Sequence, residues 1–382
     1  MNAEINVIKS DGTKSIIDLD KIHIMVEKSC RGINGVSESS VEMNSGLQFF
    51  DGITTKEIQK ILVKSASDLI SLENPNYQFV AARLLLFGMQ KQVFNTKWKD
   101  SEIYPPLQDL IERNIDKGLY TEDLTAKYSD KELKKLNSYL RHSRDFDFTY
   151  AGLQQVVDKY LVQDRSTGTL FETPQFMYML IAMTLFQDYD SDDRLLYVRR
   201  YYDAVSMFKI NIPTPVMAGV RTPLKQFASC VLVDADDSLD SLFASDMAIG
   251  RYVAQRAGIG INAGRIRGLG AKIRGGEVQH TGVIPFLKKF ESTVRCCTQN
   301  GVRGGSATVH FPIWHQEIED IIVLKNNKGT EDNRVRKLDY SIQLSELFYQ
   351  RFLKNEDITL FSPHEVPGLY EAFGTPEFDE MY

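Results

Sequence analysis

The stretch QRAGIGINAGRIRG, residues 255–268, decides how the carboxyl-terminal part of this sequence is interpreted. It places Gly258, Gly260 and Gly264 between two ends that carry arginine. Glycine lets a backbone approach a ligand closely, and arginine donates charge-assisted hydrogen bonds to phosphate or carboxylate oxygens. The pattern therefore indicates an anion near the backbone, and the question is which anion.

The glycine spacing argues against two common nucleotide-binding fingerprints. A dinucleotide fingerprint reads G-x-G-x-x-G between a strand and a long helix, whereas residues 258–264 read G-x-G-x-x-x-G. The basic run that follows (RIRGLGAKIRGG) is broken by glycine and predicts no helix start that holds a pyrophosphate. A Walker loop is excluded because the sequence lacks G-K followed by Ser or Thr.

Residue types alone leave two interpretations of the glycine-rich stretches open. A flexible loop can bring Arg265, Arg267 and Arg274 to phosphate oxygens, and residues 297–306 (CTQNGVRGGS) repeat this combination. Alternatively, both stretches are surface turns with solvated arginines.

The flanking sequence predicts an α/β domain after a helical region. From Pro213 onward, short strand-like runs (SCVLV, GIGIN, ATVHF, IIVLK and DITLF) alternate with loops and helical pieces. Residues 100–206 predict helices because long segments are apolar throughout or carry the 3.6-residue period. These segments are PLQDLIERNIDKGLY, DKELKKLNSYL, FMYMLIAMTLF and RLLYVRRYYDAVSMFKI. The string YVRRYY fits helix packing better than base stacking.

The first 95 residues predict a compact domain with a hairpin and helices. Asp11-Gly12 suits a tight turn between two β-prone runs, and Asp20 is a candidate cap for the next helix. Thr54 and Glu57 form a capping-box pattern before an amphipathic helix. A further helix (FVAARLLLFGMQKQVF) ends near residue 95.

Composition describes a soluble protein with more than one domain. The chain has 382 residues, 25% of them charged, and a net charge of -6, so bulk attraction to nucleic acid is not expected. It shows no leader peptide and no apolar run of about 20 residues, which predicts a cytoplasmic location. Its four cysteines include no C-x-x-C pair, so neither a disulfide framework nor a zinc site is predicted.

Five long motifs resemble, in order and spacing, the large (α) subunit of class I ribonucleotide reductase. The amino-terminal hairpin and helices are similar to that family's ATP-cone. The resemblance implies a mixed α+β and α/β fold with three domains: an ATP-cone at 1–95, a helical domain at 96–212, and the first half of a ten-stranded α/β barrel at 213–382. The motifs are PTPVMAGVRTPLKQFASCVLVDADDSLDS, QRAGIGINAGRIRG, IRGGEVQHTGVIPF, NGVRGGSATVHFPIWH and LKNNKGTEDNRVRKLDYSIQ.

The resemblance also implies an activity, the reduction of ribonucleoside diphosphates by thiyl-radical chemistry with a redox-active cysteine pair. It implies that Cys230 belongs to this pair and that Thr214 and Ser229 contact the substrate. Outside such a motif, a cysteine in an apolar strand is usually inert core. Because Ser229 and Cys230 are neighbours on a predicted strand, their side chains are expected on opposite faces. One substrate contact is then made by the backbone, or the strand starts irregularly.

Allosteric sites for ATP and deoxynucleoside triphosphates follow from the same resemblance. Residues matching the specificity site are Asp237, Ser238, Leu239, Arg267 and Arg274, although Asp237 alone equally fits a turn or cap. Gln299 and Arg303 match a loop that links effector and substrate base. Residues matching nucleotide contacts of the ATP-cone are Lys9, Lys21, Thr55 and Lys91. Gln59 and Gly88 stand where the family often has histidines, which leaves open whether dATP inhibits.

The motifs cover the amino-terminal half of the family. The radical cysteine, the partner of Cys230 and the tail cysteines belong to the other half. Because half a barrel leaves an open sheet edge, we expect a second polypeptide that carries the rest. We also expect pairing of α subunits, a small β subunit with the metal and radical, and a thioredoxin or glutaredoxin. No metal is expected in this chain. The alternatives are a truncated fragment and a catalytically inactive, nucleotide-binding regulatory module.

Overall fold

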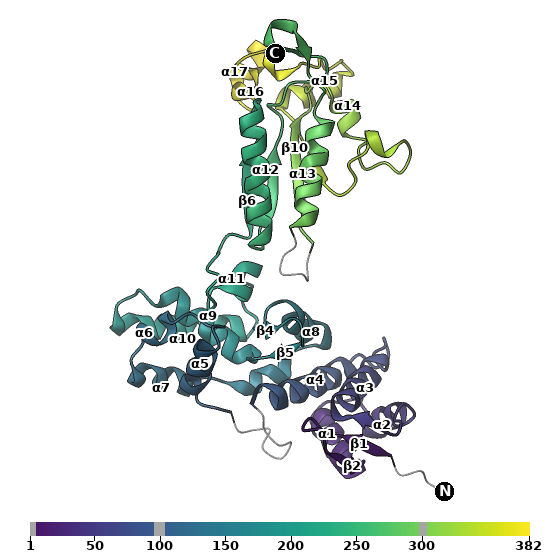
Figure 1. Ribbon diagram of the computed structural model, residues 1–382, viewed down its shortest axis with the longest axis vertical. Coiled ribbons are helices and arrows are strands. Elements are labelled where there is room, and N and C mark those ends of the chain that lie inside the picture. Colours follow the sequence, from purple (N-terminus) through teal and green to yellow (C-terminus); the bar gives the residue numbers. More distant parts are fainter. Residues whose placement is uncertain (1–4, 95–103, 298–303) are drawn as a thin grey trace. The chain divides into compact units, whose positions relative to one another are not determined.

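The computed structural model describes residues 5–94, 104–297 and 304–382. The chain divides into two compact units, Met1–Lys225 and Gln226–Tyr382 (Figure 1). The first unit contains two hydrophobic cores, one under the amino-terminal hairpin and one among the helices that follow. The second unit has a core between a sheet and its helices, and a small aromatic cluster. The three-domain division at 95 and 212 remains a prediction.

The amino-terminal part is a small sheet covered by four helices. Strands β1 (Asn6–Ile8) and β2 (Lys14–Ile16) form the predicted antiparallel hairpin, and Gly12 has the positive φ of 82° that its turn requires. Strand β3 (Ile53–Thr54) pairs with β1 in parallel. The helices are α1 (Leu19–Cys30), α2 (Glu38–Gly46), α3 (Thr55–Asp68) and α4 (Tyr77–Phe94).

The helix caps confirm one prediction and correct another. Thr54 and Glu57 form the predicted capping box at the start of α3. The prediction that Asp20 caps α1 is wrong, because the Asp18 side chain accepts the hydrogen bond from the backbone N–H of Lys21. Asp20 instead lies in the first turn, where its negative charge interacts favourably with the positive end of the helix dipole.

The rest of the first unit is helical, as predicted. Helix α9 (Pro174–Phe186) is apolar throughout, and its residues 174–184 are all buried, which is how a helix without a polar face becomes stable. The other helices are α5 (Leu107–Asp116), α6 (Asp123–Ala126), α7 (Asp130–Tyr139), η2 (His142–Asp147), α8 (Tyr150–Lys159), α10 (Ser191–Ser206) and α11 (Thr214–Gly219). A short hairpin, β4 (Gln163–Asp164) and β5 (Thr169–Leu170), precedes α9.

The second unit is built on a parallel four-stranded sheet in the order β11-β10-β7-β6. The strands are β6 (Cys230–Asp234), β7 (Gly258–Asn262), β10 (Ala307–Pro312) and β11 (Asp339–Gln343). Helices α12 (Leu239–Ala254) and α13 (Ile284–Cys296) lie side by side along the sheet (Figure 1). Their apolar side chains and those of alternate strand residues form one core, so these helices cover one face of the sheet.

Shorter elements complete this unit. They are β8 (Lys272–Ile273), η3 (Arg274–Gly276), β9 (Val278–Gln279), α14 (Ile318–Ile321), η4 (Glu331–Asn333), α15 (Glu346–Lys354), η5 (Pro363–Glu365), α16 (Leu369–Ala372) and α17 (Pro376–Met381).

Two strand predictions in this unit are wrong. The run IIVLK ends helix α14 and continues as a turn, with Ile321 and Leu324 buried and Ile322 and Val323 exposed. That burial pattern follows a helical turn rather than strand alternation. The run DITLF forms only an isolated bridge, between Phe361 and His315. The predicted strand run GIGIN is confirmed as β7, an inner strand of the sheet, so residues 258–262 are not part of a flexible loop.

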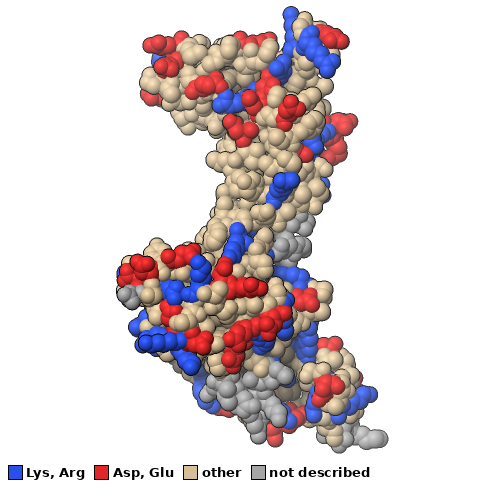
Figure 2. All heavy atoms as spheres, turned by 60° about the vertical axis from the view of Figure 1, so that its left-hand side comes forward, with Lys and Arg blue, Asp and Glu red and all other residues tan. Residues whose placement is uncertain are grey.

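The other face of the sheet is open. We call it the open face, and its residues include Cys230, Leu232, Asp234, Gly258, Gly260, Asn262, Thr308 and His310. Leu232 is 83% exposed on it, and β6 has a hydrogen-bonded neighbour on one side only within the described residues. Figure 2 shows much of this unit's surface with few charges. Within the same residues, none of the helices has the length and apolar character that crossing a membrane requires.

Candidate functional site

Cys230 begins strand β6 with its side chain exposed on the open face. Its register partner on β7 is Gly258, and a Cβ on Gly258 would lie 3.9 Å from the Cys230 sulfur. A Cβ on the next glycine, Gly260, would lie 2.6 Å from Leu232 Cδ2. The two glycines therefore leave room above the strand for the side chains of β6. This explains the glycines of the opening motif as a packing requirement of the sheet.

The two predicted substrate contacts lie in different units. Ser229 directly precedes β6, is exposed, and its carbonyl accepts a 2.8 Å hydrogen bond from the backbone N–H of Gly258. The Ser229 carbonyl is thus hydrogen-bonded to β7, while the Ser229 side chain remains accessible to solvent. Thr214 is the half-buried first residue of α11 in the first unit.

Asp237 and Arg267 are brought together, although 30 positions separate them in the sequence. Asp237 accepts hydrogen bonds from Arg267 Nε (2.8 Å to Oδ2) and from the Arg267 backbone N–H (3.0 Å to Oδ1). Arg267 Nη2 lies 2.7 Å from Oδ2, and Nη1 donates to the Lys272 carbonyl. Since a guanidinium has five N–H donors, one N–H on each terminal nitrogen remains for a ligand.

This pair stands at the start of α12. Ser238 is its N-cap and accepts from the Ser241 backbone N–H, and Leu239 is its first residue, 60% exposed. The first turn of a helix offers backbone N–H groups and a partial positive charge to an anion. Arg274 is exposed and has a φ of 51°, and its carbonyl accepts a hydrogen bond from the Glu277 N–H. Its side chain makes no hydrogen bond or ion pair with other described residues. Its guanidinium is available to a ligand.

Arg265, the first arginine after the glycines, has a different environment. It pairs with Glu371, lies 3.6 Å from an Asp234 oxygen, and its guanidinium sits 4.5 Å from the centre of the Tyr370 ring. Tyr370 in turn donates a 2.7 Å hydrogen bond to Asn262. The sequence analysis missed this cluster, because Tyr370 and Glu371 lie more than 100 positions from Asn262 and Arg265 and no local pattern links them.

The predicted contacts of the ATP-cone occupy the ends of its elements. Lys9 is exposed in the turn after β1, and Lys21, in the first turn of α1, pairs with Asp18 at 2.5 Å. Thr55 begins α3, and Lys91 lies in the last turn of α4. The parallel register of Ile8 with Thr54 places the end of β1 beside the start of α3.

Gln59 joins α3 to α4 one turn below that end. Its side-chain amide donates a 2.6 Å hydrogen bond to the Leu84 carbonyl, and a Cβ on Gly88 would lie 2.8 Å from Gln59 Cγ. The absence of a side chain at Gly88 thus lets Gln59 lie flat against α4. Since Gln59 lies opposite Leu84 and Gly88, Thr55 and Lys91 lie toward the same end of the helix pair.

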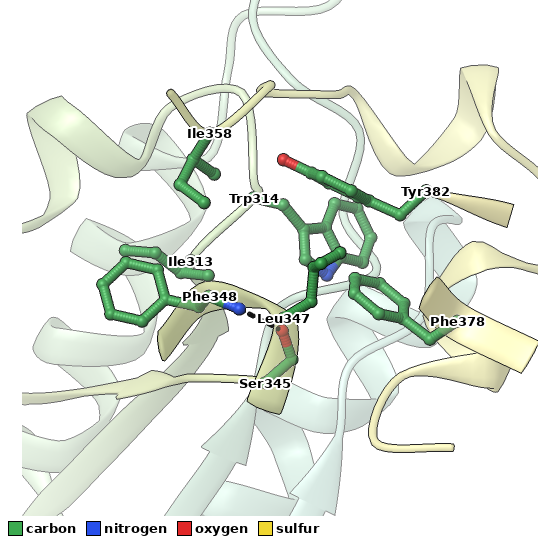
Figure 3. A pocket seen from close by; sticks show the side chains of 8 residues that line it. All are labelled: Ile313, Trp314, Ser345, Leu347, Phe348, Ile358, Phe378 and Tyr382. Atoms are coloured by element: carbon green, nitrogen blue, oxygen red, sulfur yellow. Dashed lines mark hydrogen bonds between the residues drawn. The ribbon is translucent and has the colours of Figure 1, made fainter. Parts of the chain in front are cut away.

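Two predicted residues are not described by the structure, and the described residues hold neither a metal site nor a sizeable pocket beside Trp314. Gln299 and Arg303 lie outside the described residues. Within those residues, no group of three or more His, Cys, Asp and Glu side chains is placed to hold a metal ion. A pocket beside Trp314 (Figure 3) measures about 10 Å³, hardly enough for one water, so the aromatic side chains nearly fill it.

A larger hollow of about 410 Å³ lies on the open face. Its lining residues are Leu232, Val233, Asp234, Asn262, His310 and Gln343. It occupies the carboxyl ends of the parallel strands, whereas Cys230 stands at the amino end of β6.

Comparisons with known proteins agree with the architecture. Three family models match: ribonucleotide reductase, barrel domain, over residues 228–382; ribonucleotide reductase, all-alpha domain, over 146–225; and ATP cone domain, over 5–92. The expected fold class, an ATP-cone followed by a helical domain and the first part of the barrel, is thereby confirmed.

Full-length relatives cover the whole chain. It is 50% identical over 385 residues to ribonucleoside-diphosphate reductase 1 subunit alpha of Escherichia coli strain K12. It is also 50% identical over 385 residues to ribonucleoside-diphosphate reductase subunit alpha of Haemophilus influenzae, and 47% identical over 383 residues to that of Enterobacteria phage T4. These alignments cover 100%, 100% and 99% of this chain and 50% of each relative, so the chain spans about half their length. The chain therefore belongs to the family of class I ribonucleotide reductase α subunits, whose amino-terminal half it matches.

Proposed function

We propose that the chain forms the amino-terminal half of a ribonucleoside-diphosphate reductase α subunit and supplies Cys230 to its redox-active cysteine pair. The observation that carries this proposal is the position of Cys230, exposed at the first residue of β6 on the open face. A thiol that reduces a substrate must be reachable and must find a second thiol to form a disulfide. In this proposal the second thiol comes from the other half of the barrel, and a thioredoxin or glutaredoxin regenerates the pair.

The open face supports the need for that other half. Leu232 is 83% exposed there, and the free edge of β6 offers unpaired backbone groups. Both are costly in water and are covered when a barrel closes. The remaining strands belong to the same polypeptide or to a separate one. Substrate contacts at Thr214 and Ser229 are part of this proposal.

We further propose that the start of α12 binds the triphosphate of ATP or a deoxynucleoside triphosphate. Arg267 is already oriented by Asp237 and keeps two N–H groups free, and Arg274 adds a second guanidinium. Two guanidinium groups and a helix start suit a polyphosphate. Gln299 and Arg303 are proposed to link this effector to the substrate base. Lys9, Lys21, Thr55 and Lys91 are proposed to bind nucleotide in the ATP-cone.

The exposed side of α12 is the surface we assign to pairing of α subunits. Its apolar residues Leu239, Phe243 and Met247 are 60%, 52% and 56% exposed. They recur at intervals of four residues and so form one stripe along the helix. The proposal also includes a small β subunit that holds the metal and radical, and a cytoplasmic location where thiols stay reduced.

The catalytic proposal is tested by assembling the chain with a carboxyl-half polypeptide and a small subunit. CDP reduction with thioredoxin should be lost in Cys230→Ser and retained in Cys30→Ala, because Cys30 is buried in the amino-terminal core. Turnover of Cys230→Ser at the parental rate would overturn the role of Cys230. Nucleotide binding without any turnover of the parental assembly would instead support a regulatory module.

The effector proposal is tested by equilibrium binding of deoxynucleoside triphosphates to the chain. Arg267→Ala or Arg274→Ala should weaken binding by roughly ten- to a hundredfold, since a hydrogen bond to a charged group contributes about 1.5–3 kcal/mol. Arg251→Ala removes the same charge from the opposite end of α12 and should leave affinity unchanged. Equal effects of the three variants would contradict a site at the start of α12.

A further inference from the structure

We propose that Cys296 and Cys297 form a redox-active pair of neighbouring thiols, which a peroxide converts to a reversible disulfide at the end of α13. Cys296 is the last residue of this helix and Cys297 is its C-cap. Both are free thiols, and their sulfur atoms lie 3.8 Å apart. The proposal stands on this geometry and is independent of the reductase activity proposed for Cys230.

The two sulfurs differ in accessibility, which sets the order of reaction. Cys296 is exposed, and its sulfur lies 3.4 Å from the Thr293 carbonyl. Cys297 is half-buried, and burial, followed by the neighbouring Cys296, raises the pKa of its thiol. Thiolate character and exposure govern the reaction with peroxide, so Cys296 reacts first.

The reaction balances with peroxide as the only oxidant. The Cys296 thiolate attacks one peroxide oxygen, the O–O bond breaks, hydroxide leaves, and a sulfenic acid forms. The Cys297 sulfur then attacks the Cys296 sulfur, the S–S bond forms, and the sulfenic oxygen leaves as water. The two thiols lose two electrons and two protons, and one hydrogen peroxide becomes two waters.

A disulfide between adjacent residues is strained and is therefore easily reduced. Neighbouring Cα atoms are about 3.8 Å apart across a trans peptide, whereas disulfides usually join Cα atoms about 4.4–6.8 Å apart. Strain of this kind raises the reduction potential, which is typical of labile, regulatory disulfides rather than structural ones. Ordinary cellular dithiols are thus sufficient to reopen it.

Closing the bond disturbs the contact between α13 and α12. The Cys297 N–H donates to the Thr293 carbonyl at 3.2 Å, and a Cβ on Gly250 of α12 would lie only 3.4 Å from the Cys297 sulfur. The sulfurs must approach from 3.8 Å to the S–S bond length of about 2.05 Å, so they cannot both keep these positions. Oxidation therefore loosens the last turn of α13.

The experiment uses the complete 382-residue chain with Cys230→Ser, which removes the other accessible thiol outside the pair. The reduced protein is treated with hydrogen peroxide, alkylated and digested with trypsin. Cleavage after Arg295 and Arg303 leaves both cysteines in one peptide. We expect this peptide to lack two hydrogen atoms and to carry no alkyl group, and dithiothreitol should restore alkylation at both positions.

Two single-thiol variants act as controls. In Cys297→Ser the Cys296 sulfenic acid has no neighbouring thiol to react with and should accumulate as a dimedone adduct. In Cys296→Ser the remaining Cys297 should react with peroxide more slowly. Hydrogen exchange of the backbone amides at 293–297 should accelerate after oxidation of the paired chain and recover on reduction. Full alkylation of both cysteines after peroxide, or a disulfide to another molecule, would overturn the proposal.

Discussion

The buried pair of Glu172 and Arg221 gives the strongest test of how the first unit is held together. Both side chains are fully buried. Arg221 Nε donates to Glu172 Oε2 at 2.9 Å, and its terminal nitrogens also donate to the Met217 and Tyr160 carbonyls. Glu172 additionally accepts from the Tyr120 hydroxyl and the Val162 N–H. The pair thus connects the turn after α11 to the segment between β5 and α9.

Arg221→Ala removes the guanidinium donors and leaves the Glu172 carboxylate buried without a cation, with only the Tyr120 hydroxyl and the Val162 N–H as remaining donors. Breaking a buried ion pair from one side costs about 3–5 kcal/mol. An exposed pair such as Lys127 with Asp188, 47% and 72% exposed, is screened by solvent and contributes far less to stability, so Lys127→Ala is the matched control. We expect the loss of stability in Arg221→Ala to be several times the loss in Lys127→Ala.

The assay is hydrogen exchange of the α9 backbone amides, which report the stability of this core without unfolding the second unit. A loss of about 3–5 kcal/mol lowers their protection by roughly two to more than three powers of ten. The double variant Arg221→Met with Glu172→Gln removes both charges and should recover most of the loss. Protection of Arg221→Ala equal to that of Lys127→Ala would refute the reasoning.

Three further predictions concern single positions. Gly305→Ala places a Cβ 2.2 Å from the Val294 carbonyl oxygen, so overpacking should destabilise the second unit by roughly 1–3 kcal/mol, measured by urea unfolding. The control Gly304→Ala places a Cβ with nothing within 4 Å and should leave the free energy of unfolding unchanged. Burial raises the pKa of Asp145 to about 7. The contribution of Asp145 to the free energy of unfolding should therefore be fully present below about pH 4 and be lost as the pH rises through 7. The difference in the free energy of unfolding between the parent chain and Asp145→Asn should show this dependence, and a difference that does not vary with pH would contradict it. Thr54→Ala removes the capping box and should cost about 1 kcal/mol, seen as faster amide exchange in the first turn of α3.

The sequence by itself determined the elements whose interactions are local. The hairpin at Gly12 and the capping box of Thr54 and Glu57 involve groups two to four positions apart, so composition and spacing predict them. Helix α9 follows from an uninterrupted apolar run with proline at its first position. Even here a choice between neighbouring acidic residues went wrong, because Asp18 and Asp20 are equally plausible caps until the backbone path is fixed.

The tertiary structure alone decided the contacts between distant residues. It pairs Asp237 with Arg267 and Glu172 with Arg221, 30 and 49 positions apart, and it places the predicted strand of residues 258–262 between β6 and β10. Short-range patterns do not encode which segments meet, since that depends on how strands order and helices pack. For the same reason the run IIVLK is strand-like in composition but forms the end of α14 and a turn, where Ile321 and Leu324 face the core and the two residues between them face solvent.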